Sequence, residues 1–286
     1  MRLTEIYDQN KPVISFEVFP PKTDDGLAPL LAELKKLKNF KPGLISVTYG
    51  AGGATQGRSL KLLEKISTEL NLELMPHLTC IGSSEQSILS FLQKISGWGV
   101  ENILALRGDY PRNNLDYQPE SDVFKHAADL VHFTRQRVSL SIAAAGFPEK
   151  HPEAESLQSD INHLTEKVRA GAEAVFTQLF FDNQYYYDYV KSVRAAGITA
   201  PVIPGIWTIT NLKQVQKTAE LSRARIPENL LQKLQAAAEK EVRKIGINHA
   251  AAQIRDLIKH GAPGIHLYTL NKADAVTEVL QKVSIS

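Results

Sequence analysis

Cysteine is almost absent from this chain of 286 residues, because Cys80 is its only one. An intrachain disulfide is therefore excluded, and so is a metal site built from several cysteines. No apolar run approaches the roughly 20 residues that a membrane-spanning helix needs. The polar N-terminal stretch MRLTEIYDQNKPV lacks the apolar segment of a signal peptide, so we expect a cytoplasmic protein.

An excess of one charge is also missing. The 33 Lys and Arg residues are balanced by 31 Asp and Glu, which leaves a net charge of +2 without a long block of one sign. This balance predicts neither a nucleic-acid partner nor a membrane-binding stripe. The eight histidines show no H-E-x-x-H or comparable ligand spacing, so no metal site is expected.

What the chain has is a regular alternation of short apolar runs and amphipathic stretches. Helical patterns cover 27–37, 58–70, 84–95, 121–134, 156–171 and 184–197, two or three further pieces lie between 211 and 261, and a last one covers 273–283. Between them, eight apolar runs predict strands over 13–19, 44–49, 74–80, 102–108, 140–146, 174–181, 201–206 and 264–270.

This order predicts an α/β protein with one (β/α)₈ TIM-barrel domain over residues 1–286 and extra helices between strands 7 and 8. With 43% hydrophobic residues, the chain has enough apolar side chains for one large core. A doubly wound open sheet is the alternative, because it also alternates strands and helices. The first strand is not followed by a G-x-G-x-x-G turn and no linker divides the chain, so we prefer the barrel.

The first predicted strand, in ISFEVFPPKT, carries a carboxyl group in its middle. Extended backbone places Ser15 and Glu17 on one face and only apolar side chains on the other. In a parallel sheet that is covered on both faces, such an acid is buried at a cost in free energy. Either a structural base such as Arg107 or Lys22 holds Glu17, or the acid has a catalytic task.

Barrel enzymes form their active sites at the C-terminal ends of the strands. The predicted strand ends gather polar and aromatic residues, which favours a site there. Structural explanations stay open for several of them: His77 as a core histidine, Arg107 and Asp109 as mutually neutralising charges, and 184–190 as an aromatic packing face. The residues at the ends are Glu17, Thr48, Tyr49, His77, Thr79, Arg107, Asp109, Phe147, Gln178, Trp207, Thr208, Tyr268 and Thr269.

Eight motifs in order, from Val13 to Asn271, identify a family resemblance: SFEVFPPKT, SVTYGAGGAT, PHLTCIG, NILALRGD, FPEKHPEA, TQLFFD, IPGIWTITNLKQ and LYTLN. Together they resemble methylenetetrahydrofolate reductase, a flavoprotein family with a (β/α)₈ barrel. The resemblance implies reduction of 5,10-methylenetetrahydrofolate to 5-methyltetrahydrofolate, a reaction of one-carbon metabolism that serves methionine biosynthesis. It implies tightly bound FAD, NADH or NADPH as hydride donor, and a ping-pong order.

The resemblance also implies roles for individual residues. Glu17 would be the general acid that protonates the folate nitrogen, Asp109 would lie beside the flavin and the pterin, and Gln178 would face folate and nicotinamide. Leu212, Tyr268 and Lys272, with Gln178, would bind the folate. The implied FAD contacts are Thr48, Tyr49, Ala51, His77, Arg107, Gly108, Asp109, Ala127, Ala145, Phe147, His151, Ala154, Asp160, His163 and Lys167.

A general acid must hold its proton near neutral pH, and a glutamate starts from a pKa of about 4.3. Burial raises that pKa, so we expect an uncharged Glu17.

Three positions depart from the pattern of some family members. Leu212 replaces an aromatic residue, so pterin stacking is lost or passes to Trp207. Phe147 replaces a tyrosine, and Lys272 replaces an arginine and could meet the glutamate tail without a bidentate grip.

Two other functions stay open from the sequence. One is a flavin barrel that takes electrons from a partner redox protein, and the other is a folate- or flavin-binding module without turnover. The choice of NADH or NADPH, the number of folate glutamates and a homo-oligomeric state are also open. Since the sequence ends at Ser286, without the second domain of longer eukaryotic members, we expect no inhibition by S-adenosylmethionine.

Overall fold

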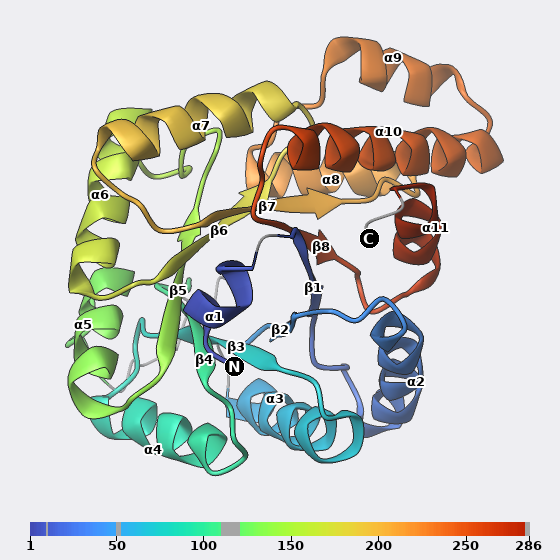
Figure 1. Ribbon diagram of the computed structural model, residues 1–286. Helices are drawn as coiled ribbons and strands as arrows, with labels where there is room; N and C mark the ends of the chain where they lie inside the picture. Colours follow the sequence, from blue (N-terminus) through green and yellow to red (C-terminus); the bar gives the residue numbers. More distant parts are fainter. Residues whose placement is uncertain (10, 50–52, 110–120, 284–286) are drawn as a thin grey trace.

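Eight parallel strands close into a barrel in the computed structural model, which describes residues 1–9, 11–49, 53–109 and 121–283. The pairing of β1 with β8 completes the ring, and the helices surround it (Figure 1). The predicted TIM barrel is therefore confirmed. The strands are β1 Val13–Val18, β2 Leu44–Val47, β3 Leu74–Thr79, β4 Asn102–Leu106, β5 Ser141–Gly146, β6 Ala174–Leu179, β7 Val202–Trp207 and β8 Gly264–Tyr268.

The helices follow the amphipathic patterns closely. Serine side chains at positions 84 and 156 accept hydrogen bonds from the first-turn backbone N–H groups of α4 and α6, which fixes these helix starts. The helices are α1 Leu3–Tyr7, α2 Leu27–Lys38, α3 Gly53–Lys65, α4 Glu85–Ser96, α5 Ala127–Arg137, α6 Leu157–Ala170, α7 Asn183–Ala195, α8 Leu212–Ser222, α9 Glu228–Ala236, α10 Glu239–Lys259 and α11 Asp274–Val283.

Three details differ from the expected pattern. The helix predicted from Ser121 begins at Ala127, and helix α1 was not predicted. Part of the run predicted as one helix over 58–70 is a π-helix, Ile66–Leu70.

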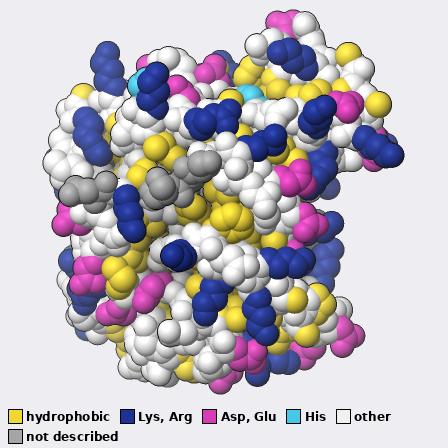
Figure 2. Space-filling view, turned by 45° about the vertical axis from the view of Figure 1, so that its right-hand side comes forward, with side chains coloured by type: hydrophobic (Ala, Val, Ile, Leu, Met, Phe, Trp, Pro, Cys, Tyr) yellow, Lys and Arg dark blue, Asp and Glu magenta, His cyan; other side chains and the backbone are white. Residues whose placement is uncertain are grey.

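Among the described residues, no helix is both long and apolar enough to pass through a membrane. Basic and acidic side chains are interspersed over the face shown in Figure 2.

Helix α1 closes the N-terminal end of the barrel. Its buried side chains Leu3, Ile6 and Tyr7 pack against interior strand residues such as Met75 and Phe176. A second, larger apolar layer fills the space between the strands and the surrounding helices. The N-terminal half of the barrel interior is therefore mainly apolar, although the buried Asn102 and Ser141 side chains bond the backbone of Met1 and Leu3 there.

Helices α8, α9 and α10 form the insertion between β7 and β8, and α9 projects from the barrel (Figure 1). The insertion has an apolar core of its own, which includes Leu234 and Val242. Helix α10 approaches the β7 loop so closely that a Cβ on Gly246 would lie 1.9 Å from the Ile209 carbonyl oxygen. A glycine is required there because any side chain would collide with backbone.

Candidate active site

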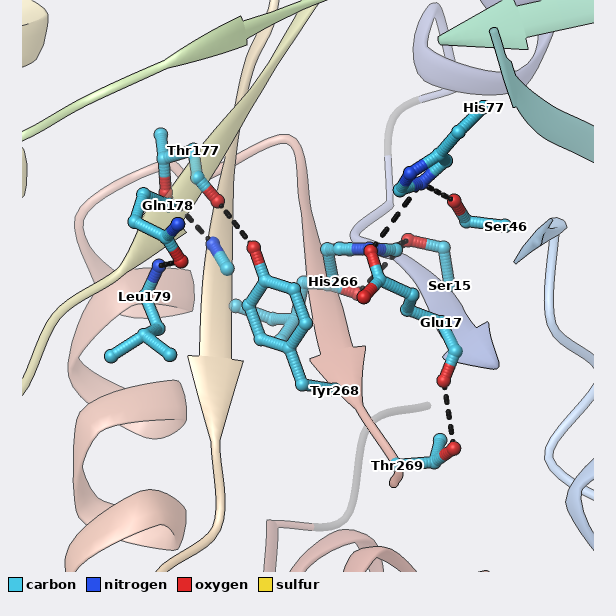
Figure 3. Close-up of polar contacts among 12 residues, drawn as sticks. Ser15, Glu17, Ser46, His77, Thr177, Gln178, Leu179, His266, Tyr268 and Thr269 are labelled. Atoms are coloured by element: carbon cyan, nitrogen blue, oxygen red, sulfur yellow. Dashed lines mark hydrogen bonds and ion pairs between the residues drawn. The ribbon is translucent and has the colours of Figure 1, made fainter. Parts of the chain in front are cut away.

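Glu17 lies in β1 with its side chain inside the barrel, whereas Phe16 and Val18 point into the outer core. Its Oε2 atom is 3.4 Å from His77 Nε2 of β3 and 3.6 Å from His266 Nε2 of β8 (Figure 3). The side chain is 19% exposed, so it is reached from the mouth and is otherwise enclosed. The alternation predicted for this strand is confirmed.

Two serines orient the imidazole rings. Ser46 Oγ lies 2.7 Å from His77 Nε2, and Ser15 Oγ lies 2.9 Å from His266 Nδ1. The strand register places these groups side by side. Ser46 of β2 is the pairing partner of Glu17, and His266 of β8 is the pairing partner of Ser15. All four supporting side chains are buried, so the carboxyl group is set in a rigid polar layer.

The protonation expected for Glu17 is wrong. Burial does raise its pKa, but the hydrogen-bonding and charge interactions of His266 and His77 outweigh burial and lower the pKa to about 2. Lys22 and Arg107 were named as structural partners, but Arg107 pairs with a different acid, and the carboxylate lies between two imidazoles. The flanking sequence is apolar, and only barrel closure brings β3 and β8 to this carboxyl group.

The wall beside Glu17 comes from β6, β7 and β8. The Tyr268 hydroxyl donates to the Thr177 carbonyl oxygen at 2.9 Å, and burial together with the charge of Glu17 raises the pKa of Tyr268 well above its ordinary value. Gln178 Oε1 accepts from the Leu179 backbone N–H at 2.9 Å (Figure 3). Three of the predicted residues, Glu17, Gln178 and Tyr268, thus lie around the same mouth.

The loop after β8 is tied to the exit of β1. The Thr269 hydroxyl donates to the Glu17 carbonyl oxygen at 2.7 Å, and Asn271 forms two hydrogen bonds with the backbone of Phe19, at 2.9 and 2.7 Å. Leu270 and Asn271 both have left-handed backbone, with φ of 50° and 61°. Such strain in a non-glycine segment persists only where other contacts enforce it, and here it fixes the rim next to Glu17.

A second group of predicted residues gathers on the loops after β4 and β5. Arg107 Nη2 is 2.9 Å from Glu153 Oε1 and 3.5 Å from Asp109 Oδ1, so Glu153 is its main partner and the expected mutual neutralisation is minor. Asp109 is 73% exposed on its side chain. Gly108 has a φ of 82°, and a Cβ there would lie 2.8 Å from Thr79 Cβ, so this turn requires glycine.

Lys167 of α6 is half-buried, and its ammonium group donates to the Ala145 carbonyl oxygen at 2.7 Å. Burial lowers the pKa of Lys167 to about 8, against the opposing charge of Asp160. Burial also raises the pKa of Asp160, whose Oδ2 accepts from the His151 backbone N–H at 3.1 Å. The Phe147 ring stands edge-on to the ring of His151, with centroids 4.7 Å apart.

The remaining predicted positions are spread around the same end or its flanks. The Thr48 N–H donates to the Val18 carbonyl oxygen at 3.0 Å, and Tyr49 packs edge-on against Phe91. Ala127 begins α5, Leu212 begins α8, and the Ala154 carbonyl oxygen accepts from Lys150. His163 Nδ1 lies 3.2 Å from Glu166 Oε2, Lys272 is exposed, and Ala51 lies outside the described residues.

His266 was missed by sequence reasoning. It stands four positions before the end of the predicted strand 264–270, so a search of strand ends alone passes over it. The available signal was the alternation of β8, in which His266 and Tyr268 share a face. A histidine on the inner face of a barrel strand, beside a strand with a buried acid, would have indicated the pair.

Comparison with known proteins adds a family to this geometry. The family model described as methylenetetrahydrofolate reductase matches residues 2–284. Methylenetetrahydrofolate reductase (NADH) 1 of Arabidopsis thaliana is 33% identical, over 99% of this chain and 50% of that protein, so this chain spans half its length. The 5,10-methylenetetrahydrofolate reductase of Escherichia coli strain K12 is 36% identical, over 91% of this chain and 87% of that protein.

Solved structures of low sequence identity share the fold. A Clostridium thermocellum protein that binds two copies of 5-methyl-5,6,7,8-tetrahydrofolic acid superimposes with a TM-score of 0.69 at 12% identity, covering 100% of this chain and 99% of that one. A dihydropteroate synthase of Xanthomonas albilineans gives a TM-score of 0.54 at 12% identity, covering 95% and 92%. At such identities the likeness shows the barrel architecture alone.

Proposed function

The chain belongs to the methylenetetrahydrofolate reductase family, and we propose that it reduces 5,10-methylenetetrahydrofolate to 5-methyltetrahydrofolate with NADH or NADPH. The barrel over residues 1–286 would act as one catalytic domain, in the cytoplasm. The observation that carries the proposal is the Glu17 carboxyl group, set in the barrel mouth between His77 and His266. Few structural roles require a carboxylate and two imidazoles together inside a barrel.

The reaction needs a proton at the nitrogen that leaves the methylene bridge. Glu17 is the acid at the open end of the barrel, so we assign it the transfer of this proton. Asp109 and Gln178 would position the pterin, and Leu212, Tyr268 and Lys272 would contact the rest of the folate. The neighbour of the same fold that binds 5-methyl-5,6,7,8-tetrahydrofolic acid supports a folate in a barrel of this shape.

The loops after β4 and β5 fit the FAD that the family implies. The Lys167 ammonium, the Arg107 guanidinium and the Gly108 turn would supply donors for phosphate and ring oxygens, as flavin binding requires. When bound, FAD would pass two electrons from the nicotinamide to the folate. Its further contacts would be Thr48, Tyr49, Ala51, His77, Asp109, Ala127, Ala145, Phe147, His151, Ala154, Asp160 and His163.

Anaerobic absorbance spectra test the proposal directly. We expect a yellow protein whose flavin absorbance disappears on addition of NADH or NADPH and returns when 5,10-methylenetetrahydrofolate is added. Buffer and 5-methyltetrahydrofolate serve as controls for the second step.

Each failure has a distinct meaning. Bleaching by dithionite but by neither nicotinamide would favour a partner redox protein as electron donor. A yellow protein that nicotinamide bleaches but folate does not restore would reject the proposed substrate, and a colourless protein that binds no flavin would reject the FAD assignment.

A further inference from the structure

His266 is more deeply buried than His77, the other imidazole beside Glu17. It is 1% exposed, and its ring lies edge-on to Phe176 and to Tyr268, with centroids 5.1 and 5.4 Å away. A buried imidazole needs partners for its ring nitrogens, because an unpaired buried polar group costs free energy. What it contacts therefore indicates what it does.

The two ring nitrogens of His266 have different partners. Nδ1 is 2.9 Å from Ser15 Oγ, and Nε2 is 3.6 Å from Glu17 Oε2, at ion-pair distance (Figure 3). A serine hydroxyl both donates and accepts, and Ser15 Oγ also lies 3.5 Å from the Ile265 carbonyl oxygen, which can take its hydrogen. The ring can therefore carry one proton or two without losing its Ser15 contact.

His77 is bound differently, although its Nε2 is slightly nearer to the carboxylate. That nitrogen lies 2.7 Å from Ser46 Oγ and 3.4 Å from Glu17 Oε2, so one atom serves both contacts. An N–H directs its hydrogen at one good acceptor, and the shorter contact is with the serine. Within the described residues, His266 Nε2 has Glu17 as its one polar neighbour, so His266 is the better proton donor to this carboxylate.

We infer that His266 is a positioning residue that holds the proton which Glu17 delivers to the folate nitrogen, an inference that rests on the proposed function. A proton passes from His266 Nε2 to the Glu17 carboxylate and from Glu17 Oε to the bridge nitrogen. The carbon–nitrogen bond breaks with its electron pair on that nitrogen, the proton completes the new N–H bond, Glu17 is again a carboxylate, and His266 is left neutral. The carbon, now an iminium, accepts the hydride that the nicotinamide donor ultimately supplies.

The surroundings make this proton transfer depend on the histidines. The groups that face Glu17 are Ser46 from β2, His77 from β3, and His266 and Tyr268 from β8, while Tyr7 of α1 reaches Ser15 at 3.5 Å. No lysine or arginine of the described residues pairs with this carboxyl group. The two imidazoles are therefore the groups beside Glu17 that can hold a proton and pass it to this carboxylate.

The pH profile of a His266→Phe variant tests the inference. At pH 7.5 we expect the folate half-reaction to slow at least about 30-fold, since general acid catalysis typically contributes 10²–10⁴-fold. At pH 5.5 we expect the rate to recover to within about threefold of the unchanged protein, since Glu17, freed from this imidazole, then carries the proton itself. His249→Phe, which alters a half-buried histidine bonded to the Phe181 carbonyl oxygen, should leave the profile unchanged.

Carbon-13 NMR of side-chain glutamate carboxyl groups gives a second readout that needs neither flavin nor folate. The Glu17 signal, assigned by its loss in Glu17→Gln, should stay ionised from pH 8 to pH 5 in the unchanged protein. It should take up a proton within that window in His266→Phe. Ser15→Ala, which removes the Nδ1 partner, should shift the titration in the same direction by less, and it keeps the inference testable if His266→Phe does not fold.

The inference is overturned if His266→Phe lowers the rate by one factor at both pH values and leaves the Glu17 signal ionised. That result would mean that the imidazole only fills space between Phe176 and Tyr268. A shifted Glu17 titration in a protein that never reduces folate would reject the proposed function and still support proton sharing between the two side chains.

Discussion

Glu17 inside the barrel and Glu149 on the loop after β5 are both withdrawn from water, yet their pKa values move in opposite directions. The Glu149 side chain is 9% exposed, and burial raises its pKa to about 6. The Glu17 side chain is 19% exposed, and its pKa is lowered to about 2. A small difference in exposure does not explain why the two pKa shifts have opposite signs.

The partners of the two carboxyl groups explain the difference. Both Glu149 oxygens share one backbone N–H, that of Arg225, at 3.1 Å, and the nearby charge of Asp182 opposes ionisation. Glu17 instead faces two imidazoles that can carry positive charge. Desolvation favours the neutral acid at both sites. It prevails at Glu149, where the hydrogen-bond donor is a neutral backbone N–H and the Arg225 guanidinium is exposed and 3.9 Å away.

The two acids therefore contribute to stability in opposite pH ranges. The folded protein holds the Glu149 proton more tightly than the unfolded chain does, so its contribution falls as the pH rises from 4.5 to about 6. Glu17 is ionised more easily in the folded protein, so its contribution is present above pH 4.5 and is lost as the pH falls toward 2. Substitutions at each site separate these effects.

The largest effect is expected from Glu17→Gln. The folate half-reaction should slow about 10³-fold, since an amide cannot donate the proton, while flavin reduction by NADH stays within about twofold. Anaerobic stopped-flow absorbance measures both halves. Glu149→Gln is the matched control, and its ratio of the two rates should equal that of the unchanged protein. An equal loss in both halves for Glu17→Gln would mean that Glu17 shapes the flavin pocket.

Replacing both imidazoles, as His77→Phe with His266→Phe, should abolish the difference between the two acids. Without them only burial acts on Glu17, so its pKa should rise from about 2 to above its ordinary value of 4.5, in the direction of Glu149. Carbon-13 NMR titration of the glutamate carboxyl groups measures the change. A Glu17 carboxyl group that remains ionised at pH 4 would show that another partner holds it.

A smaller effect is expected on stability from Glu149→Gln. At pH 7 the variant should be about 1 kcal/mol more stable relative to the unchanged protein than it is at pH 4, after allowance for solvent screening. Urea denaturation at pH 4, 5.5 and 7 measures the difference. A constant difference across these pH values would mean that Glu149 titrates alike in the folded and unfolded chains.

The smallest effect is expected from Arg225→Ala. The guanidinium is exposed, with Nε 3.9 Å from Glu149 Oε2, and exposed pairs contribute about 0–1 kcal/mol. The backbone N–H of residue 225 remains, so the pKa of Glu149 should rise only slightly. The free energy of unfolding should change by less than about 0.5 kcal/mol. A large upward shift in the NMR titration would show that the side chain, and not the backbone, sets the protonation of Glu149.

Strand order, barrel class and the inward direction of Glu17 could all be predicted, because they depend on local alternation of apolar and polar residues. The motifs also led to the two groups of residues around the mouth. Helix α1 escaped prediction because five residues, Leu3–Tyr7, give too short a pattern for a helical period. Mutual neutralisation of Arg107 and Asp109 is one explanation that the sequence leaves open, but sequence proximity gives no hint of Glu153 on the loop after β5, which is the main partner of Arg107.

A barrel with an acid on the inner face of its first strand follows from the order of the residues, because a side-chain period of two follows from backbone geometry. The charge of that acid, in contrast, depends on contacts that exist only after folding. Burial of Glu17 was foreseeable, but His77 and His266 reach it through strand register and barrel closure, from strands that are distant in the chain. A pKa is set by distances between charges, and those distances exist only in the folded molecule.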